Sequence, residues 1–171
     1  MRIAAEQVLK KANQLVSRYN TRNPERLAAF LGITIMPRQF RYQKGVYTVI
    51  ARNRYIFLKE DLPPIMRNIV LLHEIGHDVL HRNEAIQSGG FQEFNIFDMR
   101  DCRMEYEANL FAAEIALPDE DILECIEKGY DAAQIAHEMQ SDINLVALKA
   151  ADLNRRGYRF QDVEHRNNFL K

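Results

Sequence analysis

The strongest constraint on this chain is one long apolar helical stretch that carries two histidines. From Asp61 to His81, apolar residues recur at the spacing of one helix face, after two prolines suited to a first turn. His73 and His77 are four residues apart and therefore project from the same face, about 6 Å apart along the axis. This spacing lets both imidazoles bind a single zinc ion. The apolar positions are Ile65, Ile69, Leu72, Gly76, Val79 and Leu80.

Glu74 directly follows the first histidine, so it lies near the metal without having to bind it. From that position a glutamate can take a proton from a water molecule that the metal activates. The five-residue pattern, His-Glu-Ile-Gly-His, also occurs in ordinary amphipathic helices. Its weight therefore depends on whether the rest of the chain supplies a third ligand.

A catalytic zinc centre usually has three protein ligands and one water, so two histidines are not enough. His81 cannot be the third ligand, because it is eight residues from His73, which is about 12 Å of helical rise. We expect His81 instead to support the end of the helix, where a donor or cationic side chain is favoured.

The third ligand is therefore sought on a second helix, predicted over residues 98–117 and stopped by Pro118. Glu105 and Glu107 are two residues apart, about 200° around that helix, so only one can face the metal. Glu105 shares its face with small residues that permit close approach to another helix, whereas Glu107 aligns with Phe111. The residues favour Glu105 and leave Glu107 as an alternative.

Asn109 lies one turn beyond Glu105, on the same predicted face. Its amide could form a hydrogen bond with His73 or His77, the kind of contact that orients metal ligands. The sequence thus indicates two partners that hold the ligands without binding the metal, Asn109 and His81.

The remaining patterns predict an α+β fold. N-terminal helices and a small, mostly antiparallel sheet pack on the central helix, and a helical C-terminal region follows. The predicted helices are 3–19, 23–31, 119–128, 131–139 and 142–154, the strands are 33–36, 46–51 and 55–58 with a turn at Arg52-Asn53, and 83–97 is a loop.

These elements suggest a domain of residues 1–118 that contains the site, a small helical region at 119–158 packed on it, and a polar tail at 159–171. No apolar run approaches the roughly eighteen residues of a membrane span. The first residues lack the apolar core of a signal peptide. We therefore expect a cytoplasmic protein that does not bind membranes.

Charge is unevenly distributed, with thirteen Lys/Arg and four Asp/Glu in residues 1–68 and an acidic remainder. The helix pair at 131–154 superficially suits a helix-turn-helix motif. However, residues 131–152 hold four acidic side chains and one lysine, which is a poor surface for phosphate contact. We expect no direct nucleic-acid binding, and a non-catalytic module that binds DNA or a repressor is the alternative function.

The paired motifs Leu72–His81 and Glu105–Pro118 resemble the ImmA/IrrE family of zinc metallopeptidases, over roughly residues 25–158. The resemblance implies a gluzincin-like peptidase with zinc bound by His73, His77 and Glu105 and with Glu74 as the catalytic glutamate. Here Ile115-Ala116-Leu117-Pro118 replaces the commoner Leu-Leu-Met-Pro.

Family members encoded by phages and mobile elements cleave helix-turn-helix repressors. The resemblance therefore implies that this chain is an anti-repressor protease with such a repressor as its protein partner. An extended substrate could pair with an exposed edge of the 46–58 hairpin. The donor that stabilises the reaction's oxyanion stays open among Tyr106, Tyr130, His137 and Tyr158.

Overall fold

The computed structural model describes residues 5–88, 91–93 and 103–158. The chain divides into two compact units, Met1–Ala116 and Leu117–Lys171, and each is described by itself. Within the described residues, every helix is too short or too polar to cross a membrane.

Two short helices begin the N-terminal unit, α1 (Ala5–Tyr19) and α2 (Pro24–Leu31). The side chain of Asn23 accepts a hydrogen bond from the backbone of Arg26 at 2.9 Å, and Pro24 occupies the first turn of α2. Gly32 ends α2 with φ +69°, a left-handed conformation that glycine adopts without strain. Both ends of α2 are therefore encoded by local sequence.

The sheet has four strands in the order β1-β3-β2-β4. Strand β1 is parallel to β3, whereas β2 is antiparallel to both β3 and β4. The predicted α+β class and the mostly antiparallel sheet are confirmed. The bounds are β1 Ile33–Arg38, β2 Gly45–Ile50, β3 Asn53–Lys59 and β4 Phe91–Glu93.

The β2–β3 turn lies one residue before its predicted position. Ala51 and Arg52 form it with φ values of +48° and +67°, and Ile50 pairs with Asn53. This register sets Tyr47 opposite Ile56, and both side chains are fully buried. A shift of one residue would turn both toward the other face of the sheet.

The hairpin is flanked by other strands over much of its length, which limits the edge that we expected for a substrate strand. Residues 54–59 of β3 pair with β1, and residues 45–47 of β2 pair with β4. In the described sheet the outermost strands are therefore β1 and β4, not the hairpin strands.

Helix α3 (Pro64–Ser88) is longer than predicted. Residues 83–88 continue the helix and residues 91–93 form β4, so the predicted loop at 83–97 is wrong at both places. The helix is kinked at His81, whose φ of −130° and ψ of 25° are not helical. Ala85, beyond the kink, is buried, which explains why the chain continues as a packed helix.

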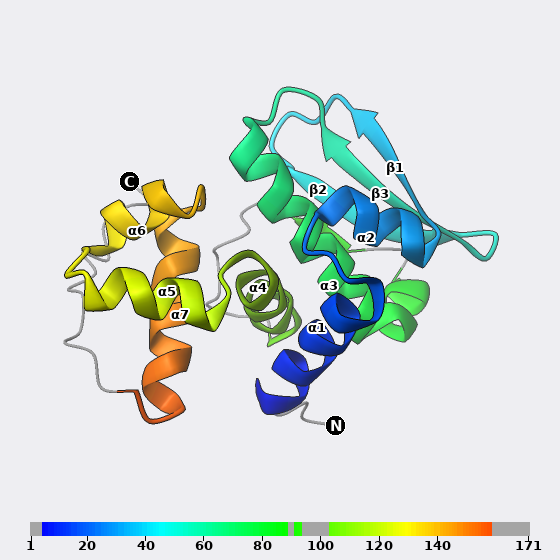
Figure 1. Cartoon of the computed structure of the whole chain (residues 1–171). Helices are drawn as coiled ribbons and strands as arrows, with labels where there is room; N and C mark the ends of the chain where they lie inside the picture. Colours follow the sequence, from blue (N-terminus) through cyan, green and yellow to red (C-terminus); the bar gives the residue numbers. More distant parts are fainter. Residues whose placement is uncertain (1–4, 89–90, 94–102, 159–171) are drawn as a thin grey trace. The chain divides into compact units, whose positions relative to one another are not determined.

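Helix α4 (Arg103–Ala116) packs against both α3 and α1 (Figure 1). The predicted first residues of this helix, 98–102, lie outside the described residues. Asn13 of α1 donates a hydrogen bond to the carboxylate of Glu114 at 2.7 Å. Arg22 donates to the carbonyl oxygens of Glu114 and Ile115. Helix α4 is thus held between α1 and the central helix.

The described part of the C-terminal unit, up to residue 158, contains three helices, α5 (Asp119–Glu127), α6 (Ala132–Glu138) and α7 (Ile143–Arg155). Asp131 caps α6 in a capping box, and Asp142 caps α7. Asp119 forms ion pairs with Lys149 and Arg156, which fasten α5 to α7 and its C-terminal end. The predicted tail, 159–171, lies outside the described residues.

Candidate metal centre

His73 and His77 lie on the face of α3 that is turned into the N-terminal unit, and both are fully buried. Their Nε2 atoms are 3.0 Å apart. Two residues four apart on a helix point in nearly the same direction, so this convergence follows from the sequence spacing. Burial on an apolar helix keeps both rings in place.

Glu105, in the first turn of α4, brings its carboxylate to the same point. Its Oε2 is 3.1 Å from Nε2 of His73, and its Oε1 is 3.4 Å from Nε2 of His77. One ligand atom from each of these three residues lies within 4.8 Å of the others. Imidazole nitrogen and carboxylate oxygen are zinc ligand types, and two histidines with one glutamate form a known catalytic set. The three side chains therefore fit a zinc ion.

Close contact between α3 and α4 makes this convergence possible. A Cβ atom at Gly76 would lie 3.2 Å from Cα of Ala108, tighter than ordinary contact, and 3.2 Å from the ring of Phe111. A larger residue would force the helices apart. Gly76 therefore sets the separation that lets Glu105 reach the histidines.

Burial also lowers the pKa of His77. Loss of water around the ring, together with the neighbouring His73, lowers the pKa of His77 to about 4, although Glu105 opposes this shift. The ring is consequently neutral at physiological pH. A metal ion binds only the neutral form of imidazole, so no proton has to be removed before binding.

Glu74 is fully buried beside the histidines. The first residue of β2, Gly45, lies against it, and a Cβ atom there would be 2.6 Å from Oε1 of Glu74. The same hypothetical atom would be 2.7 Å from Cγ1 of Val70. The sheet backbone thus approaches the glutamate as closely as a glycine allows. The sequence analysis did not identify this role of Gly45.

Both predicted supporting residues lie beside the histidines. Oδ1 of Asn109 is 2.9 Å from Nδ1 of His73, and Asn109 is fully buried. Nδ1 of His81 is 3.3 Å from Nδ1 of His77. Burial lowers the pKa of His81, with Glu107 opposing the shift. Each histidine of the pair therefore has a neighbour at its second nitrogen.

Glu107, the alternative ligand, lies on the far side of His81. Its Oε2 is 2.8 Å from Nε2 of His81, and its Oε1 accepts a hydrogen bond from Arg103 at 2.6 Å. It is not part of the three-residue group that could hold a metal in the described chain. The structure thus brings Glu105 to the two histidines and directs Glu107 to His81.

A buried polar cluster beside the site was not foreseen. Asp78, fully buried next to His77 in sequence, accepts hydrogen bonds from Tyr47 at 2.6 Å and from Arg54 at 3.0 Å. Arg82 also donates to it, at 2.9 Å. Burial and Asp78 together raise the pKa of Tyr47 above its usual range. The one sequence signal for this cluster was the spacing of four residues between Asp78 and Arg82, which suits an ion pair along a helix.

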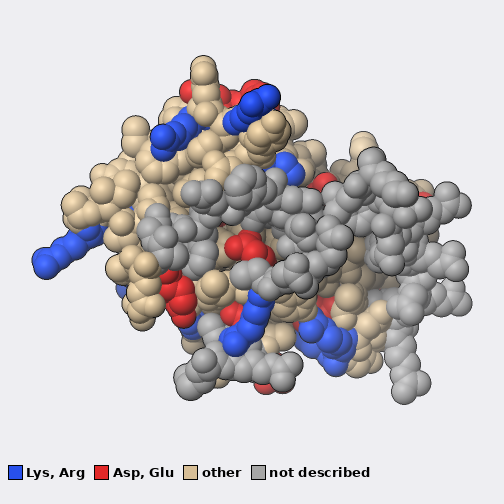
Figure 2. Space-filling model, turned by 180° about the vertical axis from the view of Figure 1, so that it is seen from behind, with Lys and Arg blue, Asp and Glu red and all other residues tan. Residues whose placement is uncertain are grey.

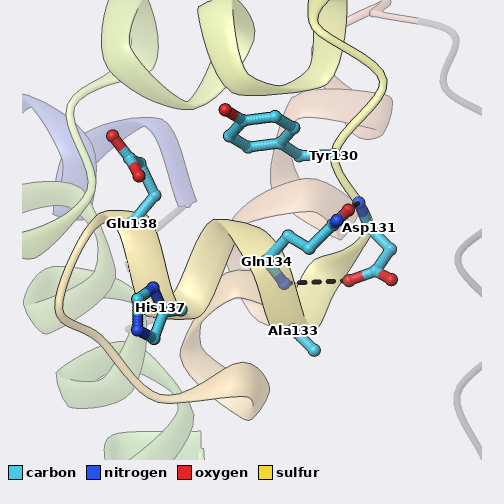
Figure 3. Close-up of a pocket in the computed structure, with 6 residues that line it drawn as sticks. All are labelled: Tyr130, Asp131, Ala133, Gln134, His137 and Glu138. Carbon is cyan, nitrogen blue, oxygen red and sulfur yellow. Dashed lines mark hydrogen bonds between the residues drawn. The ribbon is translucent and has the colours of Figure 1, made fainter.

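The four candidate oxyanion donors are divided between the units. Tyr106 lies on α4, and the other three lie in the C-terminal unit. Tyr130 and His137 line a surface pocket of about 460 Å³ along α6. Figure 3 shows the capping bond between Asp131 and Gln134 at the start of α6, and His137 and Glu138 projecting from the other end of the helix.

Two comparisons relate the chain to known proteins. Residues 28–151 match the sequence model of the peptidase M78 family, described as the IrrE N-terminal-like domain. The chain is also similar to "Uncharacterized immunity region protein 2" of Bacillus phage phi105, with 34% identity over 114 residues. That alignment covers 66% of this chain and 70% of the phage protein. The family match includes all of α3 and α4, which carry the three candidate ligands.

Proposed function

Because this chain belongs to the peptidase M78 family, we propose that it is a zinc-dependent endopeptidase that hydrolyses a peptide bond in a protein substrate. The observation that carries the proposal is the convergence of His73, His77 and Glu105 beside the buried Glu74. The proposed catalytic domain is residues 1–118, followed by a helical region at 119–158.

In this mechanism the zinc ligands are His73, His77 and Glu105. Bound zinc supplies Lewis-acid activation of water and of the scissile carbonyl. Glu74 accepts the proton of the attacking water and delivers it to the leaving amine. Glu74 is fully buried beside the histidines, so its carboxylate is shielded from bulk water.

We propose a helix-turn-helix repressor as the substrate, so that cleavage would release the repressed genes. Support comes from the similarity to a phage protein named for an immunity region and from the family resemblance of the paired motifs. This role places the protein in the cytoplasm, where such a repressor binds DNA.

The metal assignment is tested by elemental analysis of purified wild type, Glu105→Ala and Glu107→Ala. We expect about one zinc per chain in the wild type, a large loss in Glu105→Ala and retention in Glu107→Ala. The second variant is a matched control from the same helix. Equal loss in both variants, or no zinc in the wild type after reloading, would contradict the assignment.

The peptidase activity is tested by mixing the protein with a helix-turn-helix repressor encoded beside its gene and following cleavage by mass spectrometry. Glu74→Gln preserves the shape of the side chain but removes the base, so we expect zinc to stay bound and cleavage to stop. A Glu74→Gln protein that still relieves repression in cells would favour a role through binding.

That binding role is the second candidate, and the charge distribution argues against its DNA-binding form. Figure 2 shows Lys and Arg side chains in several separate places on the face it presents, with Asp and Glu side chains among them. In the helix pair α6–α7, Lys149 is fully buried in its ion pair with Asp119, and Arg155, at the end of α7, is paired with Asp152. Phosphate contact needs accessible cations.

A further inference from the structure

A series of side chains leads from the surface of α4 to His77, and its hydrogen-bond directions can be worked out from Glu107. The carboxylate of Glu107 is 5% exposed, accepts from Arg103 at 2.6 Å and lies 2.8 Å from Nε2 of His81. The oxygens of a carboxylate that is paired with an arginine accept hydrogen bonds. Nε2 of His81 must therefore carry the proton and donate a hydrogen bond to Glu107.

The direction of the hydrogen bond between His81 and His77 follows from the same reasoning. Neutral His81 with its proton on Nε2 has a lone pair on Nδ1, which lies 3.3 Å from Nδ1 of His77. Nδ1 of His77 must then be the donor. The lone pair of His77 is consequently on Nε2, the atom that faces His73 and Glu105.

A separate contact, with Asn109, indicates the same tautomer for His73, with the proton on Nδ1. Oδ1 of Asn109 accepts at 2.9 Å from Nδ1 of His73, so the lone pair of His73 is also on Nε2. The two Nε2 atoms are only 3.0 Å apart. Two lone pairs at this distance, beside a carboxylate, repel one another unless a proton or a metal ion lies between them.

We propose that Glu107 and His81 are positioning residues that fix the tautomer and ring orientation of His77, so that its Nε2 is ready to bind the metal. This inference rests on the proposed zinc site. It gives a role to Glu107, which does not reach the metal-binding atoms. His81 is also the residue at which α3 departs from helical geometry, so the kink lies where the ring contacts both His77 and Glu107.

The test compares Glu107→Gln with Glu114→Gln. Both glutamates are buried on α4, but Glu114 accepts from Asn13 and lies away from the histidine series. A glutamine at residue 107 can turn its amide nitrogen toward His81 and so permits the other tautomer. We expect zinc affinity, measured by competition with a chromophoric chelator, to fall about 10- to 100-fold in Glu107→Gln and to stay near wild type in Glu114→Gln.

Histidine tautomers are measured directly by long-range ¹H–¹⁵N correlation NMR on the metal-free and zinc-loaded full chain. We expect wild-type His81 protonated at Nε2 and His77 at Nδ1 in both states, and a mixture of tautomers in metal-free Glu107→Gln. This readout does not need peptidase activity, and in the metal-free protein it does not need zinc.

The outcomes separate the two proposals. The expected tautomers in a wild type that binds no zinc would confirm the hydrogen-bond series but overturn the zinc peptidase, and with it the metal-binding purpose of the series. Zinc binding with unchanged affinity and tautomers in Glu107→Gln would overturn the positioning series alone. Equal loss of zinc affinity in both glutamine variants would mean that Glu107 contributes only to the stability of the fold. That result would also overturn the positioning series.

Discussion

Gly45 lies directly against Glu74, with room between them for a hydrogen but not for a methyl group. The contact joins the first residue of β2 to the proposed catalytic glutamate on α3. It makes the sheet part of the site even though the sheet contributes no ligand. Substitutions at residue 45 should therefore affect the reaction more than the metal.

Gly45→Ala tests this contact. The new methyl group would stand 2.6 Å from Oε1 of Glu74, and the flexible end of the glutamate would give way before the backbone does. A displacement of about 1 Å at a reacting group can reduce the rate roughly 100-fold. We expect a large loss of cleavage rate with normal zinc content, and a near-normal rate for Val46→Ala, the matched neighbour. A fully active Gly45→Ala protein would contradict the prediction.

Gly76→Ala tests the contact between the two ligand-bearing helices. Alanine favours a helix over glycine by about 1 kcal/mol, but overpacking against a helix backbone costs about 1–3 kcal/mol. Because Cα and the carbonyl oxygen of Ala108 are the nearest atoms, we expect the cost to exceed the gain. Urea unfolding should show a net loss of about 1 kcal/mol, whereas Asn83→Ala, on the exposed face of α3, should change little. Increased stability of Gly76→Ala would show that α4 can move away freely.

Asp78→Asn tests the polar cluster that joins α3 to the sheet. The amide keeps the size of the side chain but leaves Arg54 and Arg82 without their anion. Breaking a fully buried ion pair costs about 3–5 kcal/mol. Here the side chains of Arg54 and Arg82 are 23% and 46% exposed, so we expect a smaller loss, about 2 kcal/mol.

Tyr47→Phe removes one donor from the same cluster and should cost about 1–2 kcal/mol, because the hydrogen bond it loses is to a charged group. The double variant, Tyr47→Phe with Asp78→Asn, should lose less than the sum of the two single losses. Strict additivity in denaturant unfolding would mean that the two side chains act independently.

Asp119 predicts a pH dependence in the C-terminal unit. Burial raises the pKa of Asp119, but hydrogen bonds from Arg156 and Lys149 outweigh it and lower that pKa to about 2, from a usual 3.8. The folded state therefore holds the negative charge more strongly than the unfolded state. The resulting stabilisation is complete above the usual value and is lost as the pH falls toward about 2.

We expect the wild type to exceed Asp119→Asn in unfolding free energy by a constant amount near neutral pH. The difference should shrink as the pH falls below about 4. Denaturant unfolding of both proteins across this range measures it. A difference that does not change with pH would mean that the charge of Asp119 does not contribute.

The residues of the candidate metal centre could be identified from sequence because helical geometry is local. A spacing of four places His73 and His77 together whatever the rest of the chain does. The small residues beside Glu105 favoured it over Glu107 for a similarly simple reason. The sequence left Glu107 as an alternative ligand because it does not reveal the contact between Glu107 and His81. That contact forms at a kink in α3, which the spacing of apolar residues does not predict.

The remaining features depend on contacts between distant segments. Strand β4 has only three residues and exists as a strand through its pairing with β2. The position of the hairpin turn follows from the burial of Tyr47 and Ile56. That burial depends on helix α3, which packs against β2 and β3. Gly45 acquires its role from Glu74, which is 29 residues away. Asp78 acquires its role largely from Tyr47 and Arg54, which are 31 and 24 residues away.

The support of α4 by α1 has a consequence for how the protein is made. Asn13 and Glu114, which join these helices, are 101 residues apart. At about 5–20 residues per second of translation, His77 leaves the ribosome a few seconds before α4 is complete. During that interval the first two ligands exist without the third, and closing so long a loop is slow. If the proposed site takes up zinc, newly made chains should hold it weakly until α1 closes over α4, which would make metal capture one of the last steps of synthesis and folding.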